Sequence, residues 1–189
     1  GGIIVLVADD PSMHSSQNEQ DSRFYAKFAM IPCFEPSCQQ EAYDMVGFAF
    51  DYSERVHLPV LMRVTTRMAH SRAVVEIADQ PRKQNDINYN SKSSEWVLLP
   101  AMARKRNDIV TAQQVELEKD SVKSNFNIYY DNKDKTLGIV TGGIGINYLN
   151  ECYPDECPYP VLKIGQYPLP KDLLRNMTKE CDEILVIEE

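Results

Sequence analysis

Side chains with acid–base and hydrogen-bonding chemistry are concentrated in residues 10–21, near the start of the 189-residue sequence. His14 lies within this stretch, and an imidazole can gain or lose a proton near neutral pH. Hydroxyls and amides follow it at Ser15, Ser16, Asn18 and Gln20. A loop of this composition can orient a polar ligand or stabilise its charge, although His14 could equally bridge backbone groups of its own loop.

A second polar cluster, Thr65–Ser71, contains Arg67 and His70, three residues apart. If the segment is helical, this spacing puts both side chains on one side. The guanidinium of Arg67 is suited to a carboxylate or phosphate ligand. A structural ion pair with Glu76 or Asp10 explains Arg67 equally well, so both roles stay open.

Both polar clusters follow predicted strands of one parallel sheet. The apolar, β-branched run 3–8 predicts a strand that is buried on both faces, and residues 58–65 predict the next strand. Between them, Ser37 and Gln40 have the spacing of a capping box, which opens a helix to about residue 56. A right-handed crossover makes the two strands parallel, so both clusters are expected at the carboxyl edge, where ligands bind. The helix is predicted to bury Ala42, Met45, Val46, Ala49 and Phe50.

The rest of the sequence predicts a connection and a second α/β unit. A short helix is predicted over 21–29. Residues 79–94 lose periodicity and indicate a linker, after which 96–100 is expected to anchor the chain on a domain. Residues 101–123 predict a highly charged helix. The second unit is expected to have strands at 137–141, 161–164 and 183–187, and helices that end near residues 151 and 180.

None of the spacings indicates a metal, phosphate or nucleophile site. The turn 142–145 lacks the third glycine of GxGxxG, which favours a plain tight turn. Ser15 and Ser16 lack the GxSxG elbow of a nucleophile. Helix capping and turns explain four nearby carboxylates better than metal binding does: Asp9, Asp10, Glu19 and Asp21.

The composition argues against two classes of partner. A formal charge of −8 argues against nucleic acid, and the cations 104–106 are expected to form a solvated helix face. No apolar run approaches the roughly 20 residues of a membrane span. The five cysteines have spacings that match neither common zinc nor cluster motifs, which predicts reduced thiols and a cytoplasmic location.

Several longer motifs resemble the alpha subunit of indolepyruvate:ferredoxin oxidoreductases. The most specific is VADDPSMHSSQNEQDSR over residues 7–23, in which Ser12 replaces the commoner glycine. If that glycine serves a turn with positive φ, Ser12 is expected to strain it slightly. Further matches lie at 35–37, 40–45, 59–63, 65–72, 137–143, 167–170 and 184–189.

The resemblance implies a thiamine-diphosphate enzyme that oxidatively decarboxylates aryl pyruvates to aryl-acetyl-CoA and reduces ferredoxin. For residues 1–78 it implies the C-terminal part of a pyrimidine-binding domain with a parallel sheet. Residues 79–123 would be a linker and charged helix, and residues 124–189 a transketolase C-terminal-like α/β domain. The abrupt start on a core strand also leads us to expect an internal fragment.

The resemblance places the family's catalytic glutamate upstream of this sequence, and the motif that binds the diphosphate and Mg²⁺ and the cysteines of the 4Fe-4S clusters downstream of it, so that about half of the thiamine-diphosphate site is absent. The isolated chain is therefore expected to hold no catalytic residue, metal or cofactor and to be inactive. The implied partners are the remainder of the alpha subunit, a beta subunit, ferredoxin, CoA and the aryl pyruvate. The candidates to line the substrate or cofactor cavity are His14, Ser15, Ser16, Asn18, Gln20, Arg67 and His70. Two alternatives stay open, the same chemistry on another 2-oxoacid and a non-catalytic assembly or regulatory module.

Overall fold

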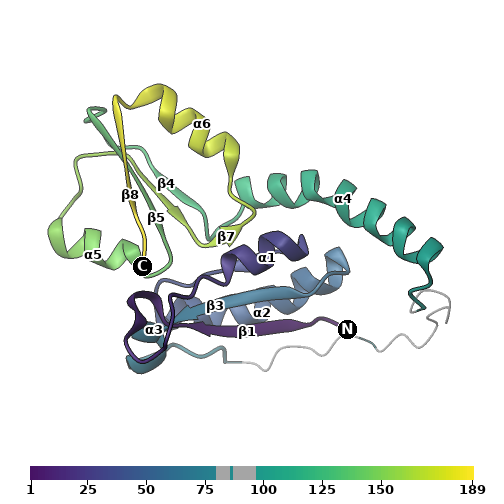
Figure 1. Cartoon of the computed structure of the whole chain (residues 1–189). Helices are drawn as coiled ribbons and strands as arrows, with labels where there is room; N and C mark the ends of the chain where they lie inside the picture. Colours follow the sequence, from purple (N-terminus) through teal and green to yellow (C-terminus); the bar gives the residue numbers. More distant parts are fainter. Residues whose placement is uncertain (80–85, 87–96) are drawn as a thin grey trace.

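The computed structural model describes residues 1–79, 86 and 97–189 of the chain. Two four-stranded sheets rich in parallel pairs, each flanked by helices, form two parts that lie side by side (Figure 1). The α/β class predicted from the sequence is therefore confirmed. The predicted linker 79–94 and Trp96 lie almost entirely outside the described residues.

The first sheet has the strand order β1-β3-β2-β7. Strands β1 and β3 are parallel, with Ile4 opposite Val60 and Asp9 opposite Thr65, as the crossover argument predicts. The N-terminal part consists, in chain order, of β1 (Ile4–Asp9), the 3-10 helix η1 (Pro11–Met13), α1 (Arg23–Ala29), β2 (Cys33–Phe34), α2 (Gln39–Val56), β3 (Val60–Thr65) and α3 (Thr66–His70).

Successive side chains of β3 alternate between the two helices that cover the sheet. Val60 and Met62 pack in the core beneath α2, together with Met45. Leu61 packs instead against Ala26 of α1. Since side chains two residues apart share a face, Arg63 lies on the α1 side.

The prediction that the first strand is buried on both faces is wrong. Val5 is 43% exposed and Leu6 is 66% exposed, and these neighbours point to opposite faces of the strand. The physical reason is position, because β1 pairs only with β3 and forms the edge of the sheet within the described part. An apolar run can identify a strand but does not say what lies beside it.

The predicted start of α2 is also wrong by one residue. The helix begins at Gln39 after the N-cap Cys38. The Ser37 backbone N–H and hydroxyl both donate to Glu41 Oε2, at 2.6 and 2.7 Å, so Ser37 interacts with Glu41 rather than capping the helix with Gln40. Two predicted core residues on this helix are exposed, Val46 and Phe50.

The second sheet has the strand order β4-β6-β5-β8. Strand β5 is parallel to both β6 and β8, and β4 is antiparallel to β6. Helix α5 covers one face and α6 the other. The C-terminal part consists of α4 (Pro100–Val122), β4 (Ile128–Tyr130), β5 (Leu137–Gly142), α5 (Gly145–Cys152), β6 (Val161–Ile164), β7 (Gln166–Tyr167), α6 (Lys171–Glu180) and β8 (Glu183–Ile187).

Three observations refine the predictions for this half. Residues 97–100 are exposed, so the expected anchor before α4 is wrong for its described part. The sequence did not predict β4 or β7. The charged helix α4 is confirmed, with Leu117 buried in the core beneath α2 and Ile109 and Val115 exposed.

No helix in the ranges 1–79 and 97–189 is both long and apolar enough to cross a bilayer.

The two parts share secondary structure. Strand β7 follows the second sheet's β6 in the chain but pairs antiparallel with β2 of the first sheet, Tyr167 opposite Cys33. The chain therefore returns to the first sheet before α6 begins. This arrangement brings the carboxyl ends of β1, β3, β5 and β8 into one region (Figure 1).

Candidate functional site

Asp10 organises the polar loop that follows β1. Its Oδ2 accepts hydrogen bonds from the backbone N–H groups of Ser15 and Ser16, at 2.7 and 2.8 Å. Its Oδ1 accepts one from the Thr66 hydroxyl at 2.6 Å. The Thr66 hydroxyl and the Ser15 N–H hold the pKa of Asp10 well below its usual range. One carboxylate thus ties the loop to α3, and the two predicted clusters are adjacent as expected.

Further hydrogen bonds within the loop fix its path. Gln20 Oε1 accepts from the Asp10 backbone N–H at 3.0 Å, and Gln20 Nε2 donates to Ser16 Oγ at 3.3 Å. The carboxylate of Glu19 accepts from the Ser12 N–H at 3.0 Å. Ser12 has φ +61°, in the left-handed region that favours glycine. The expected strain at Ser12 is therefore present in the backbone.

The candidate residues of the loop divide into two groups. The side chains of Ser16 and Gln20 are half-buried and bonded to each other. His14 and Asn18 are exposed; Asn18 donates to the Glu19 carbonyl at 3.1 Å. The His14 imidazole makes no hydrogen bond or ion pair with any residue that the structure describes. Ser16 and Gln20 therefore support the loop, whereas His14 is free to meet another molecule.

Arg67 has a partner that sequence reasoning missed. Its Nε lies 2.6 Å from Glu189 Oε1, beyond the end of β8, and its guanidinium lies 5.4 Å from the centroid of the Tyr148 ring. Both partners predicted for a structural ion pair, Glu76 and Asp10, are therefore wrong. Arg67 joins α3 to the C-terminal part of the chain. His70 is exposed in the last turn of α3.

Beneath this surface lies a buried ionic cluster around Arg63, which is 1% exposed. Its Nε lies 2.6 Å from Asp9 Oδ2, its Nη1 donates to Glu35, and its Nη2 donates to the Glu189 carbonyl at 3.3 Å. Although burial opposes the charged form, the attraction of Glu35 and the hydrogen bond to Asp9 hold the pKa of Arg63 above its usual value. Ser22 completes the cluster, since its N–H and hydroxyl both donate to Asp9.

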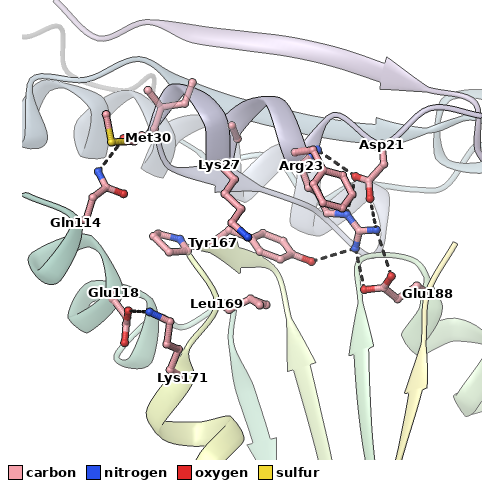
Figure 2. Close-up of a pocket in the computed structure, with 14 residues that line it drawn as sticks. Asp21, Arg23, Lys27, Met30, Gln114, Glu118, Tyr167, Leu169, Lys171 and Glu188 are labelled. Atoms are coloured by element: carbon pink, nitrogen blue, oxygen red, sulfur yellow. Dashed lines mark hydrogen bonds and ion pairs between the residues drawn. The ribbon is translucent and has the colours of Figure 1, made fainter. Parts of the chain in front are cut away.

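A second arginine extends the cluster toward α1. Arg23 binds Asp21 through two nitrogens, Nε and Nη2, each at 2.8 Å, and its Nη1 donates to Glu188 at 3.1 Å (Figure 2). The Tyr167 hydroxyl donates to Glu35 Oε2 at 3.0 Å. Burial and the neighbouring Glu35 carboxylate raise the pKa of the Tyr167 hydroxyl well above its usual value. Charged side chains from both sheets thus form one network at the strand ends.

The glycine turn after β5 packs on this network. Gly143 has φ +44°, and a Cβ atom at this position would lie 2.6 Å from Glu35 Cγ. Only a residue without a side chain allows this approach. The turn therefore has a structural role at the junction of the two sheets, which agrees with the plain tight turn that its spacing favours.

The described residues do not converge on a metal. No three His, Cys, Asp or Glu side chains in the described ranges come close enough together to hold an ion. Asp9 and Asp10 point to different partners, Arg63 and Thr66. All five cysteines are free thiols. Neither Mg²⁺ nor an iron–sulfur cluster fits the side chains described.

The chain shares its fold with a solved structure. The structure aligns with a 2-oxoglutarate:ferredoxin oxidoreductase from Magnetococcus marinus, solved with 2-oxoglutarate, coenzyme A and succinyl-CoA bound, at a TM-score of 0.63. The alignment covers 96% of this chain and 40% of that one at 12% sequence identity, so it establishes a shared fold. No family model matches the sequence.

Sequence comparison finds relatives that match the whole length of the chain. Over the whole chain the sequence is 38% identical to the indolepyruvate oxidoreductase subunit IorA of Archaeoglobus fulgidus and 38% identical to that of Methanothermobacter thermautotrophicus. It is 36% identical to the subunit of Pyrococcus horikoshii. The chain is thus homologous to a segment of the IorA subunits, and the predicted resemblance is confirmed. It spans 30–31% of the length of these relatives.

Proposed function

We propose that this chain is a segment of the alpha subunit of a thiamine-diphosphate-dependent oxidoreductase. The complete enzyme would oxidatively decarboxylate indolepyruvate and other aryl pyruvates to aryl-acetyl-CoA and pass the electrons to ferredoxin. The observation that carries the proposal is the similarity of the whole chain to IorA subunits, whose name gives indolepyruvate as the substrate. The fold shared with an oxidoreductase that acts on a 2-oxoacid supports the reaction class.

The cofactors and partners follow from the same proposal. The complete enzyme would use thiamine diphosphate, Mg²⁺ and 4Fe-4S clusters; the diphosphate, Mg²⁺ and the clusters would bind to other parts of the subunit, and the described residues of this chain offer no converging metal ligands. The partners would be the remainder of the alpha subunit, a beta subunit, ferredoxin, CoA and the aryl pyruvate. A cytoplasmic location agrees with five free thiols.

We assign a domain to each part of the chain. Residues 1–78 would be the C-terminal part of a pyrimidine-binding domain, residues 79–123 a connection that includes α4, and residues 124–189 a transketolase C-terminal-like domain. The exposed strand β1 supports the first assignment, because apolar side chains on both faces are typical of a strand whose two faces are covered in a complete parallel-sheet domain.

The polar loop and α3 are proposed to contribute one wall of the substrate or cofactor cavity. His14 and Asn18 would contact the ligand directly because their side chains are exposed, and His70 would lie nearby. The loop that carries His14 and Asn18 would be held in place by hydrogen bonds from the Ser15 and Ser16 N–H groups to Asp10. Gln20 would support the same loop by donating to the Ser16 hydroxyl. Arg67 would orient α3 through Glu189. In these roles the residues orient polar groups and stabilise charge, and none is the general acid or nucleophile.

The reaction is tested on the full-length subunit with its partner subunit. CoA-dependent reduction of ferredoxin is measured anaerobically with indolepyruvate, phenylpyruvate, pyruvate and 2-oxoglutarate. Fast turnover of the aryl pyruvates alone is expected. Preference for pyruvate or 2-oxoglutarate would refute the substrate, and no turnover of any 2-oxoacid by the loaded enzyme would refute the reaction. The isolated 189-residue chain is expected to be inactive.

Two matched variants test the role of the loop. His14→Asn removes the exposed imidazole of the loop, whereas His57→Asn removes another exposed imidazole, at the end of α2. Asn tolerates the positive φ of His57. A fall of kcat/KM for indolepyruvate in His14→Asn but not in His57→Asn is expected. Equal activity of both variants would exclude a direct role for His14.

A further inference from the structure

A cavity of about 420 Å³ lies between α1, α4 and the segment that joins β7 to α6 (Figure 2). This volume is typical of small-molecule sites, which range from roughly 300 to 1,000 Å³. None of the loop residues 10–20 lines it, so it is separate from the proposed cavity wall described above. Its walls are mainly apolar, from Phe24, Ala26, Met30, Ile31, Pro168 and Leu169.

The charged residues that line the cavity are paired, with one exception. Arg23 binds Asp21 and Glu188, and Lys171 binds Glu118 at 2.5 Å. Lys27 lines the cavity and forms no ion pair with any described residue. Figure 2 shows the Lys27 side chain extending from α1 toward the cavity. The cavity thus offers one positive charge that forms no ion pair within the described part of the chain, and an aromatic ring, Tyr167, lines the same cavity.

The cavity also offers an unused hydrogen-bond acceptor. Gln114 Nε2 donates to the carbonyls of Met30 and Val110, at 2.9 and 3.0 Å. These bonds hold the amide in place while its Oε1 accepts no hydrogen bond from any residue in the described ranges. A bound molecule with an N–H or O–H group can use this oxygen.

We propose that this cavity binds a small monocarboxylate with an aromatic or similarly apolar body. The ring would lie against Leu169 and Tyr167, and the carboxylate would form a charge-assisted pair with Lys27 at the mouth of the cavity. A dianionic phosphate fits less well, because Lys27 is the one lining cation without a carboxylate partner among the described residues, and it can balance a single negative charge. This site is independent of the proposed catalytic function and would exist even if that function were wrong.

The test measures binding to the full-length subunit by fluorine NMR, with p-fluorophenylpropionate as the probe. Lys27→Met and Leu169→Asp change two residues that are exposed at the cavity, so both variants are expected to fold. Lys179→Met is the matched control, since it removes an exposed lysine of α6 that does not line the cavity. Each cavity variant is expected to weaken binding about tenfold, the size of one charge-assisted contact, and the control is expected to leave it unchanged.

Two related probes test the chemistry of the ligand. The fluorophenyl phosphate is expected to bind more weakly than the carboxylate, and the fluorophenethylamine is expected not to compete with it. Equal affinity of wild type, Lys27→Met and Leu169→Asp for the carboxylate would overturn the proposal. Competition by the amine would overturn it as well, because a cation cannot pair with Lys27.

Discussion

Arg63→Met removes the cation that lies between two buried carboxylates. The variant loses the bonds to Asp9 Oδ2, to Glu35 and to the Glu189 carbonyl, while the methionine fills part of the space. Breaking a buried ion pair from one side costs about 3–5 kcal/mol. The lower end applies here, because Asp9 keeps its bonds from Ser22 and Glu35 keeps the Tyr167 hydroxyl. We therefore expect a loss of about 3 kcal/mol in the free energy of local opening.

The assay is hydrogen exchange of the full-length subunit, read in peptides that cover β1 and β3. A change of about 3 kcal/mol corresponds to exchange that is about 100-fold faster. Arg55→Met is the matched control. Arg55 also contacts a carboxylate, Asp120 at 2.7 Å, but its side chain is 55% exposed, so the expected loss is below about 1 kcal/mol. Similar effects of Arg63→Met and Arg55→Met would refute the argument that burial makes the Arg63 cluster essential.

Three further predictions concern the loop and the junction of the sheets. Gly143→Ala is expected to lower the thermal midpoint of unfolding, with a loss of about 1–3 kcal/mol, because the new Cβ meets Glu35 and the backbone has φ +44°; an unchanged midpoint would contradict the close packing. Ser12→Gly is expected to slow hydrogen exchange of the loop by relieving the left-handed Ser12, and faster exchange would contradict it. The pKa of Asp10 in the folded chain is lower than its ordinary value of 3.8. Ionised Asp10 therefore stabilises the loop fully above about pH 4, and this stabilisation is lost as the pH falls from there through the lowered pKa of the folded chain. In the wild type, hydrogen-exchange protection of the loop, corrected for intrinsic exchange rates, is expected to be lower at about pH 3 than at about pH 6. In Asp10→Asn this pH-dependent difference is expected to be smaller. An equal difference in both proteins would contradict the role of Asp10.

Much of the fold could be predicted because hydrophobic patterns are local. The runs at β1, β3, β5, β6 and β8 and the helices between them are recognisable from periodicity alone. The crossover rule then predicts that the polar loop and α3 are neighbours, and the hydrogen bond from Thr66 to Asp10 confirms it. Strand β7 was missed because two residues are too few to show a period.

The buried cluster could not be predicted, because its members are far apart in the sequence. Arg63 stands in the run Leu61–Val64, where its position suggests only a strand. The one available signal is the charge itself, because a cation inside an apolar run requires a buried partner. The sequence does not say that the partners are Asp9 and Glu35, or that Arg67 pairs with Glu189. Such pairs depend on the completed tertiary structure.

Strand β7 has a consequence for any attempt to exchange parts between this chain and its relatives. The chain leaves the first sheet through α4, builds most of the second sheet, and returns to pair Gln166 and Tyr167 with β2. A chimera joined at residue 124 would therefore replace one strand of the first sheet together with the whole of the second. Grafting succeeds only where the donor's β7 matches the recipient's β2, so these two strands are expected to diverge in step among homologues.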